Sequence, residues 1–500
     1  MRTTQPTSSP PHPAAPPGPV APASRRSRWA APAAIAAGAV ALRIPAYLAV
    51  RHVSFDDGVY GASAVALRTG ARPFREVFSS QGPLFLPLVW LCDRLGLRTL
   101  DAPRLLALAS GVALVVATWC AARALRLSAP AAGLAAGLVA TSGSVLWVTG
   151  PLTSDGPGLA LAAAAVAAAL RYRRSPSAGW AVAAGALLGA ALSVKSLLLG
   201  AVLPVGWALL PNRRHLAAAL AAAGAVSLAV ALPWGLGNVW DQAFRYHLEA
   251  AGSRTPLRNL RKVISTLGDR DLPIVLAALA SGVLAALAHL RTRRRPAGSA
   301  ESTAERTGLV VAWLLTTILV LAAEHPLWRN HVAHLIPPAA LLVAAGFDRL
   351  RAGSPRRGRA AVAVVAATAA LAVPYHVVHL SEVLWPAPPG KALAAARADL
   401  RALPSGGEVI SDDPGVVWRA GRRTPPDLVD TSILRIESGR LTAASLARAA
   451  ADRRVCAVLV WSHRFADLTP LPDLLQQVGY SAGPRYGGPK VLWRRPGCAT

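Results

Sequence analysis

The chain has 500 residues, of which 53% are hydrophobic and only 16% charged, and its mean hydropathy is +0.39. This composition is typical of membrane proteins and excludes an ordinary soluble enzyme of the same length. The formal charge of +28 comes from 53 Lys and Arg against 25 Asp and Glu. Because the basic residues cluster in short gaps between apolar runs, they indicate membrane topology, and we predict no nucleic-acid partner.

The first 28 residues are rich in Pro, Ala, Ser and Thr and contain no apolar core. We therefore predict a disordered cytoplasmic tail at 1–28 and no cleavable signal peptide. Basic residues at 25–28 directly precede the first apolar run, and the positive-inside rule then places the N-terminus in the cytoplasm. The long loop 51–104 follows on the outer side. Its apolar stretch 83–97 is short and contains Asp93 and Arg94, so we predict a helix in the outer interface, not a span.

About eleven segments are predicted to cross the membrane as helices, which makes 29–385 a polytopic α-helical membrane domain. This threading keeps most of the basic clusters in the cytoplasm. The segments are 29–50, 105–122, 129–148, 158–170, 178–194, 197–210, 216–234, 272–290, 309–323, 332–347 and 360–379.

The last part of the chain, 386–500, is less hydropathic and is predicted to be a small extracytoplasmic α/β domain. Segments 407–410, 455–461 and 490–493 are typical of buried strands, and 441–452 is typical of a helix. Cys456 lies in one of these strands and Cys498 near the end of the chain. They either form a disulfide or remain thiols, and we favour a buried thiol at Cys456; no Cys or His spacing indicates a metal site.

Carboxylates gather where predicted spans meet the outer surface. Asp56 and Asp57 are adjacent in the first outer loop, and Asp155 lies in the second outer loop, directly before a span. Neighbouring like charges repel, so a site that keeps both usually holds a cation, a proton or a sugar hydroxyl. The alternative is that these residues only cap the next helix, and Pro157 in the first turn fits that alternative for Asp155.

Cationic and imidazole side chains are predicted on the same outer face. His331 and His334 are three residues apart and share one helix face at the start of a span, where they could bind an oxyanion or simply anchor at the lipid headgroups. Arg258 and Arg261 lie in the outer loop 240–270, although long loops need not follow the positive-inside rule. Bound phosphate would explain these arginines.

Several stretches of sequence resemble the C-type glycosyltransferases (GT-C), in the family 39-like branch that holds protein mannosyltransferases and lipid A aminoarabinose transferases. The first outer loop has FDDGVY at 55–60, GARPF at 70–74 and QGPLF at 81–85. The second outer loop has TSDGP at 153–157, and a late outer loop has HVAHLIPP at 331–338. The resemblance extends over about 29–379.

The resemblance implies a GT-C-like fold and the transfer of a sugar from a polyprenyl-phosphate donor. The acceptor would be a glycan, a lipid or a protein at the outer face of the cytoplasmic membrane. One carboxylate of the first-loop motif would be the general base, and we prefer Asp56 to Asp57. Asp155 would match a second acidic motif, but Ser154 stands where the family often has another acidic residue.

Two needs of such a reaction suggest further site residues. The leaving phosphate needs cations, for which Lys195, Arg258, Arg261, His331 and His334 are candidates. A divalent cation, Mg²⁺ or Mn²⁺, held by Asp57 and Asp155 is an alternative source of positive charge. Because Ser154 replaces an acidic residue, that metal site would be incomplete.

A transporter or flippase of lipid-linked sugars is the alternative function. It would also have many spans, but it predicts ionisable residues at mid-span and inverted repeats between halves. The acidic residues here lie at span ends on one face, and an extracytoplasmic domain follows. These features favour the transferase.

Overall fold

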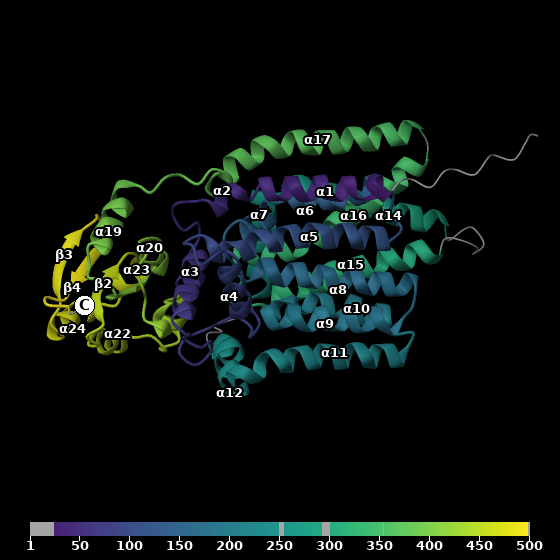
Figure 1. Ribbon diagram of the computed structural model, residues 1–500. Helices are drawn as coiled ribbons and strands as arrows, with labels where there is room; N and C mark the ends of the chain where they lie inside the picture. Colours follow the sequence, from purple (N-terminus) through teal and green to yellow (C-terminus); the bar gives the residue numbers. More distant parts are fainter. Residues whose placement is uncertain (1–24, 250–254, 293–300, 354, 499–500) are drawn as a thin grey trace, which may run out of the picture.

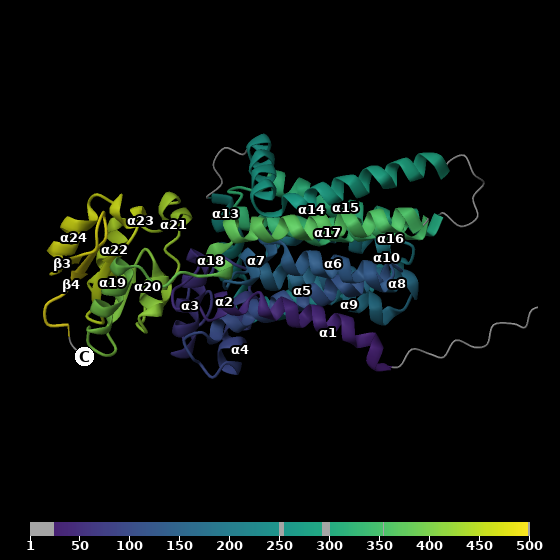
Figure 2. The ribbon, with the colours of Figure 1, turned by 90° about the horizontal axis from the view of Figure 1, so that it is seen from above.

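The chain forms a bundle of long helices with a smaller α/β domain at one end. This computed structural model describes residues 25–249, 255–292, 301–353 and 355–498. The bundle comprises 25–379, and the C-terminal domain packs against one end of it in both views (Figure 1, Figure 2). Most of the predicted cytoplasmic tail, 1–24, lies outside the described residues, whereas 25–28 already belong to the first helix.

All eleven predicted membrane segments coincide with helices, in whole or in part. The segment 129–148 is divided into two helices, and the segment 272–290 follows a kink at Asp271. The bundle helices are α1 (Arg25–Ala41), α5 (Leu105–Ala124), α6 (Ala129–Thr141), α7 (Gly143–Thr149), α8 (Asp155–Arg174), α9 (Ala178–Val194), α10 (Val202–Leu209), α11 (Arg213–Ala231), α14 (Pro256–Thr292), α15 (Glu301–Ala323), α16 (Ile336–Gly353) and α17 (Pro355–His379).

Three helical segments of the described chain are long and apolar enough to cross a membrane: Ala102–Ala124, Arg213–Trp234 and Arg329–Ala352. The pair α6 and α7 makes a fourth if its 61° bend is counted as one broken span. Other apolar helices, such as α9 and α15, are shorter or contain polar ends. The number of eleven spans therefore stays a prediction.

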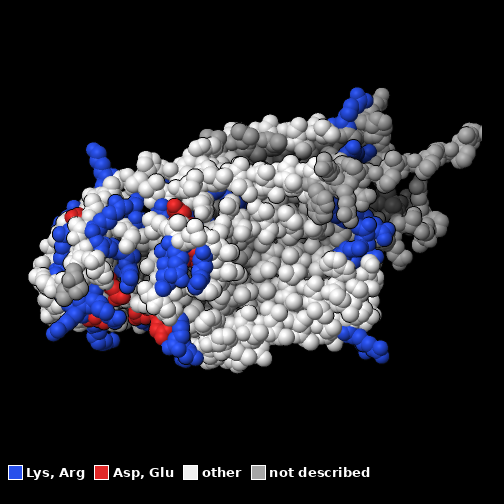
Figure 3. All heavy atoms as spheres, in the orientation of Figure 1, with Lys and Arg blue, Asp and Glu red and all other residues white. Residues whose placement is uncertain are grey.

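The outer surface of the bundle is apolar between its two ends. Leu220 on α11, Leu279 on α14 and Leu319 on α15 are each more than 60% exposed. Figure 3 shows Lys and Arg gathered at the two ends of the molecule, with an almost uncharged band of bundle surface between them. A continuous apolar band of this kind suits contact with lipid.

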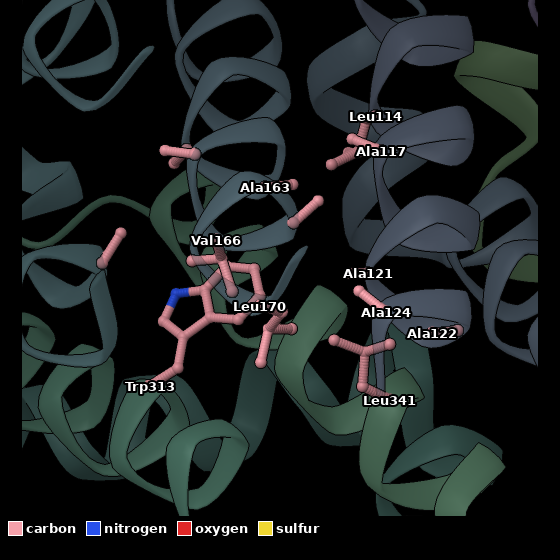
Figure 4. Close-up of a cluster of buried hydrophobic side chains, with 14 of the residues drawn as sticks. Leu114, Ala117, Ala121, Ala122, Ala124, Ala163, Val166, Leu170, Trp313 and Leu341 are labelled. Atoms are coloured by element: carbon pink, nitrogen blue, oxygen red, sulfur yellow. The ribbon is translucent and has the colours of Figure 1, made fainter. Parts of the chain in front are cut away.

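Small residues let the bundle helices approach closely. A Cβ added at Gly185 on α9 would lie 2.0 Å from the carbonyl oxygen of Ala219 on α11, and one at Gly189 would lie 2.4 Å from that of Ala223. Close packing of this kind stabilises helix pairs where lipid removes the hydrophobic driving force. Elsewhere in the bundle, Ala, Val and Leu side chains pack around Trp313 of α15 (Figure 4).

Short elements connect the bundle helices at the end that faces the C-terminal domain. Helix α4 is only 11 residues long, and Trp90, Leu91 and Leu95 on it are exposed, as an interfacial helix requires. Its Asp93 is buried and paired with Arg68 at 2.6 Å. The connecting elements are α2 (Ile44–Tyr47), α3 (Phe55–Arg68), α4 (Phe85–Leu95), η1 (Ala102–Arg104), η2 (Ser196–Ala201), η3 (Leu232–Trp234), α12 (Leu236–Val239), the π-helix η4 (Trp240–Arg245), α13 (Tyr246–Glu249) and η5 (Arg329–Leu335).

The C-terminal domain is built on a four-stranded sheet in the order β1-β2-β4-β3. Strands β1 (Glu408–Ser411) and β2 (Val455–Val460) are parallel, and β4 (Val491–Arg494) pairs antiparallel with both β2 and β3 (Ser481–Arg485). The three predicted strands are confirmed, whereas the exposed strand β3 was not predicted. The helices are α18 (Ser381–Leu384), α19 (Lys391–Arg401), α20 (Pro414–Arg419), η6 (Pro426–Leu428), α21 (Ile433–Glu437), α22 (Ala443–Ala450), α23 (His463–Ala466) and α24 (Leu471–Gln477).

The state of the two cysteines in this domain differs from the prediction. Cys456 and Cys498 form a disulfide that ties β2 to the end of the chain, so the preferred buried thiol was wrong. The sequence left both states open, because only the fold shows that the two Cα atoms lie 5.4 Å apart, within the range for a disulfide.

The domain docks on the segment 51–104, the predicted first outer loop, through close glycine contacts and an ion pair. A Cβ at Gly58 of α3 would lie 2.6 Å from the Cα of Gly415, and one at Gly61 would lie 2.3 Å from the ring of Trp418. Beside this contact, His52 pairs with Asp413 at 3.2 Å. Helix α3, which carries the paired aspartates, is thus held between the bundle and the C-terminal domain.

Candidate active site

A cavity of about 880 Å³ lies where the bundle meets the C-terminal domain. Its wall combines the start of α3, the ends of bundle helices and the segment 430–434 with Arg464 of the C-terminal domain. Ionisable side chains from distant parts of the sequence line it: Asp56, Asp155, Lys195, His247, Lys262, Arg270, Glu324, His325, Arg329, His331, Asp430 and Arg464. A mostly apolar cavity with convergent polar groups is the usual form of a small-molecule site.

Asp56 lies in the first turn of α3 and points a free carboxylate into this cavity. Ser54 is the N-cap of the helix, because its hydroxyl accepts the Asp57 N–H at 3.2 Å, so neither aspartate is needed as the cap. Among the described residues, Asp56 forms no hydrogen bond or ion pair. Burial raises the pKa of Asp56 to about 6; Lys195 opposes this shift, and the carboxylates of Asp155 and Asp430 add to it. A carboxylate of this kind can exchange a proton near neutral pH.

Asp57 faces the other way and is fully buried. Arg104 donates to both of its carboxylate oxygens, at 2.6 and 3.0 Å, and the N–H groups of Val53 and Leu152 donate at 2.9 and 3.2 Å. Burial opposes ionisation, but Arg104 and these two N–H groups outweigh it and lower the pKa of Asp57. This carboxylate is saturated and does not line the cavity, so its position fits a structural role and not the predicted catalytic one.

Asp155 is the centre of a buried ion-pair network. Its Oδ2 accepts a hydrogen bond from Lys195 Nζ at 2.9 Å, and its Oδ1 lies 2.9 Å from His334 Nε2. Lys195 also donates to Ser154 Oγ at 3.3 Å, and Ser154 donates to Gln81 at 2.8 Å. Asp155 is the first residue of α8 and Ser154 the N-cap, so the capping alternative does not account for Asp155. The network fixes the ammonium group of Lys195 at the cavity wall.

The two histidines have different positions. Both lie on the 3₁₀-helix η5, where residues three apart eclipse, and their rings stack with centroids 6.2 Å apart. His331 lines the cavity, and its Nδ1 has no hydrogen-bond partner among the described residues. His334 is only 2% exposed and contacts Asp155 instead. We therefore expect His331 to contact a ligand and His334 to position Asp155.

The predicted outer-loop arginines are not brought into the cavity. Arg258 and Arg261 lie near the start of α14 and are exposed away from it, so their position does not fit phosphate binding there. Lys262 and Arg270 on the same helix line the cavity instead, and each cation lies over an aromatic ring, of Trp328 and Trp147 respectively. The sequence predicted an outer loop at 240–270, whereas 256–270 belong to helix α14, and the rotation of that helix selects the residues that face inward.

Three comparisons with known proteins bear on this architecture. Neither family models nor curated proteins match the sequence. Among solved structures, ArnT from Cupriavidus metallidurans, bound to undecaprenyl phosphate, matches with a TM-score of 0.60 at 16% identity over 95% of this chain and 100% of that chain. The oligosaccharyltransferase of Archaeoglobus fulgidus, tethered with an acceptor peptide, matches with a TM-score of 0.57 at 13% identity over 93% and 74%.

A third structure agrees with these two. The arabinofuranosyltransferase AftD from Mycobacteria matches with a TM-score of 0.51 at 17% identity, over 94% of this chain and 42% of that chain. All three are GT-C glycosyltransferases. This chain has the GT-C fold.

Within this GT-C fold, both predicted metal ligands are engaged in other contacts. Asp57 is already occupied by Arg104 and two backbone N–H groups, and Asp155 is occupied by Lys195 and His334. In the part of the chain that the structure describes, no three His, Cys, Asp or Glu side chains are placed to hold a metal ion. The residues present do not fit a cation between Asp57 and Asp155.

The GT-C fold also brings in residues that sequence reasoning missed. Tyr60 lies one turn after Asp56, lines the cavity and packs edge-on against Phe85 at 4.5 Å. Gln81 lies in the QGPLF motif at 81–85, to which the sequence alone assigns no role. Asp430 and Arg464 come from the C-terminal domain, where the sequence offered no signal that links them to the first outer loop.

Proposed function

We propose that this protein is a membrane glycosyltransferase. It moves a sugar from a polyprenyl-phosphate donor to a hydroxyl acceptor at the outer face of the cytoplasmic membrane. The observation that carries the proposal is that two groups line the same cavity. One is the carboxylate of Asp56, which has no partner among the described residues, and the other is the ammonium group of Lys195, which Asp155 holds in place. The GT-C fold supports it, since a neighbour with this fold was solved with undecaprenyl phosphate bound.

The cationic groups of the cavity suit a lipid phosphate. Lys195, Lys262, Arg270 and Arg329 come from the bundle side of the wall, which also includes the exposed apolar side chains of Trp240 and Leu248. There, a polyprenyl tail can stay in lipid while its phosphate enters the cavity. Charge-assisted hydrogen bonds to phosphate are among the strongest available to side chains. We expect Lys195 to stabilise the charge that develops on the leaving phosphate.

In this proposal Asp56 is the general base, which accepts the proton of the acceptor hydroxyl. The acceptor oxygen forms a bond to the anomeric carbon of the donor sugar, and the bond from that carbon to the phosphate oxygen breaks. The hydroxyl proton moves to the carboxylate of Asp56, and polyprenyl phosphate leaves with the bonding electron pair. A base with a raised pKa near the working pH is well matched to this task.

The proposed orientation places the N-terminus in the cytoplasm and the C-terminal domain outside. The basic residues at the start of α1, the end of α8 and the start of α11 lie at the bundle end remote from the C-terminal domain (Figure 1) and support this orientation through the positive-inside rule. The disulfide between Cys456 and Cys498 also supports it, because disulfides persist mainly outside the reducing cytosol.

Reconstitution tests the proposed function. The purified full-length chain in proteoliposomes should bind undecaprenyl phosphate and transfer label from radiolabelled polyprenyl-phosphate sugars to a carbohydrate acceptor. Lys195→Gln should raise the apparent Kd for undecaprenyl phosphate by roughly 10- to 100-fold, because a charged hydrogen bond is lost. Lys391→Gln, on the exposed start of α19, is the matched control. Wild-type protein that neither binds the lipid nor transfers label would refute the function.

The pH dependence of transfer reports on Asp56. Only the ionised carboxylate accepts a proton, and the pKa of Asp56 is raised to about 6. We therefore expect kcat/KM to be constant above that value and to fall about tenfold per pH unit well below it. Initial rates between pH 4.5 and 8 would measure this fall in kcat/KM, after confirming that the protein stays folded at each pH. A flat profile through pH 6 would contradict the role of Asp56 as base.

A further inference from the structure

The cavity wall contributed by the C-terminal domain differs in chemistry from the bundle wall. The bundle supplies four Lys and Arg side chains, whereas the segment 430–434 supplies the carboxylate of Asp430 and the hydroxyl of Ser432. Arg464 also lines the cavity from the C-terminal domain, but its guanidinium donates to the carbonyl of Asp412 and lies over the ring of Phe55. Phosphate is repelled by a carboxylate, so the segment 430–434 is unsuited to the donor headgroup. It is suited to a ligand that donates hydrogen bonds.

Asp430 is held firmly and is not neutralised by an ion pair. It is 5% exposed, its Oδ1 accepts the Ser432 N–H at 2.9 Å, and its Oδ2 accepts Ser80 Oγ at 3.2 Å. Arg435 donates to the backbone carbonyl of Asp430 at 2.7 Å, and among the described residues no cation pairs with the carboxylate. Each oxygen keeps a free lone pair, because an ionised carboxylate can accept about four hydrogen bonds.

Contacts across the domain boundary fix this segment against the outer loops of the bundle. Ser432 Oγ lies 3.0 Å from Tyr246 Oη, and the Arg435 guanidinium lies over the ring of Phe78 at 4.1 Å. Asp430 therefore stays at a set position relative to Asp56. Asp56, Tyr60 and Asp430 all line the same cavity.

We propose that the acceptor is a carbohydrate and that Asp430 positions it. One hydroxyl of the sugar donates a hydrogen bond to Asp430, while a neighbouring hydroxyl faces Asp56. The inference rests on the proposed function and names the acceptor class for the same cavity. A polyhydroxylated sugar ring can donate hydrogen bonds to two separate carboxylates at once, which a single alcohol cannot. The C-terminal domain thus contributes directly to acceptor recognition, and Asp430 is a positioning residue.

The test separates acceptor use from donor use. Proteoliposomes containing the full-length chain receive radiolabelled polyprenyl-phosphate sugars, with octyl glycosides of several neutral sugars as acceptor probes. The rate of transfer at varied acceptor concentration gives the acceptor KM. The release of free labelled sugar gives the rate at which water hydrolyses the donor. Asp430→Asn keeps the shape of the side chain, and Asp430→Glu keeps the charge. Asp427→Asn, three residues away on the exposed side of the same loop, is the matched control.

We expect Asp430→Asn to raise the acceptor KM about tenfold or more, since a charge-assisted hydrogen bond is weakened. The donor KM and the rate of donor hydrolysis should stay within about twofold of the Asp427→Asn values, and Asp430→Glu should have an intermediate acceptor KM. An unchanged acceptor KM would overturn the inference. So would a parallel fall of transfer and hydrolysis, which would assign Asp430 a purely structural role. Wild-type protein that neither transfers nor hydrolyses label would overturn the proposed function itself, and the inference with it.

Discussion

Asp56→Asn should lower sugar transfer by roughly 10²–10⁴-fold, the contribution of a well-placed acid or base. Asn matches the shape of Asp but cannot take the acceptor proton. Asp56 forms no hydrogen bond or ion pair among the described residues, so the substitution removes no structural contact. Transfer rates of the reconstituted variant, at matched protein levels, would measure the loss. The residual activity should no longer fall below pH 6.

Two measurements make this result specific. Asp467→Asn removes the same charge from an exposed position on the C-terminal domain and should leave transfer unchanged. Binding of undecaprenyl phosphate to Asp56→Asn should be at least as tight as to the wild type, because a negative charge near the phosphate is gone. An Asp56→Asn protein with near wild-type transfer would remove this residue from the mechanism.

Arg104→Met should lower the free energy of unfolding by about 3–5 kcal/mol, the usual cost of leaving a buried charge without its partner. Both side chains of the pair are fully buried, and Arg104 also donates to the carbonyls of Ala49 and Arg51 at 2.7 Å. Thermal or denaturant unfolding in detergent would measure the loss. Arg75→Met, on an exposed arginine of the same loop, is the control.

The double variant Asp57→Asn with Arg104→Met should recover part of the stability lost in Arg104→Met, because no unpaired charge remains. An Arg104→Met protein as stable as the Arg75→Met control would contradict the structural role of the pair. It would also reopen the hypothesis that Asp57 binds a ligand. The two aspartates thus differ in what their loss changes. Asp56→Asn lowers the transfer rate, whereas loss of the ion pair of Asp57 lowers the free energy of unfolding.

The sequence by itself determined the class of the protein and the order of its helices. Long apolar runs have one stable form in lipid, a helix, so the eleven predicted segments coincide with helices. The three buried strands of the C-terminal domain follow from short β-branched runs in the same way. The motif at 55–60 also predicted a carboxylate at this position, although only Asp56 of the two lines the cavity.

Only the tertiary structure decided which of these charged residues face the cavity. Asp56 and Asp57 are adjacent, and a helix turns them about 100° apart, so one points to the cavity and the other to Arg104, 47 residues away. The same geometry exposes Arg258 and Arg261 and turns Lys262 inward. Asp430 joins the site through a domain contact 350 residues from Ser80 in the chain. No local pattern encodes such a contact, because it depends on how two separately formed surfaces pack.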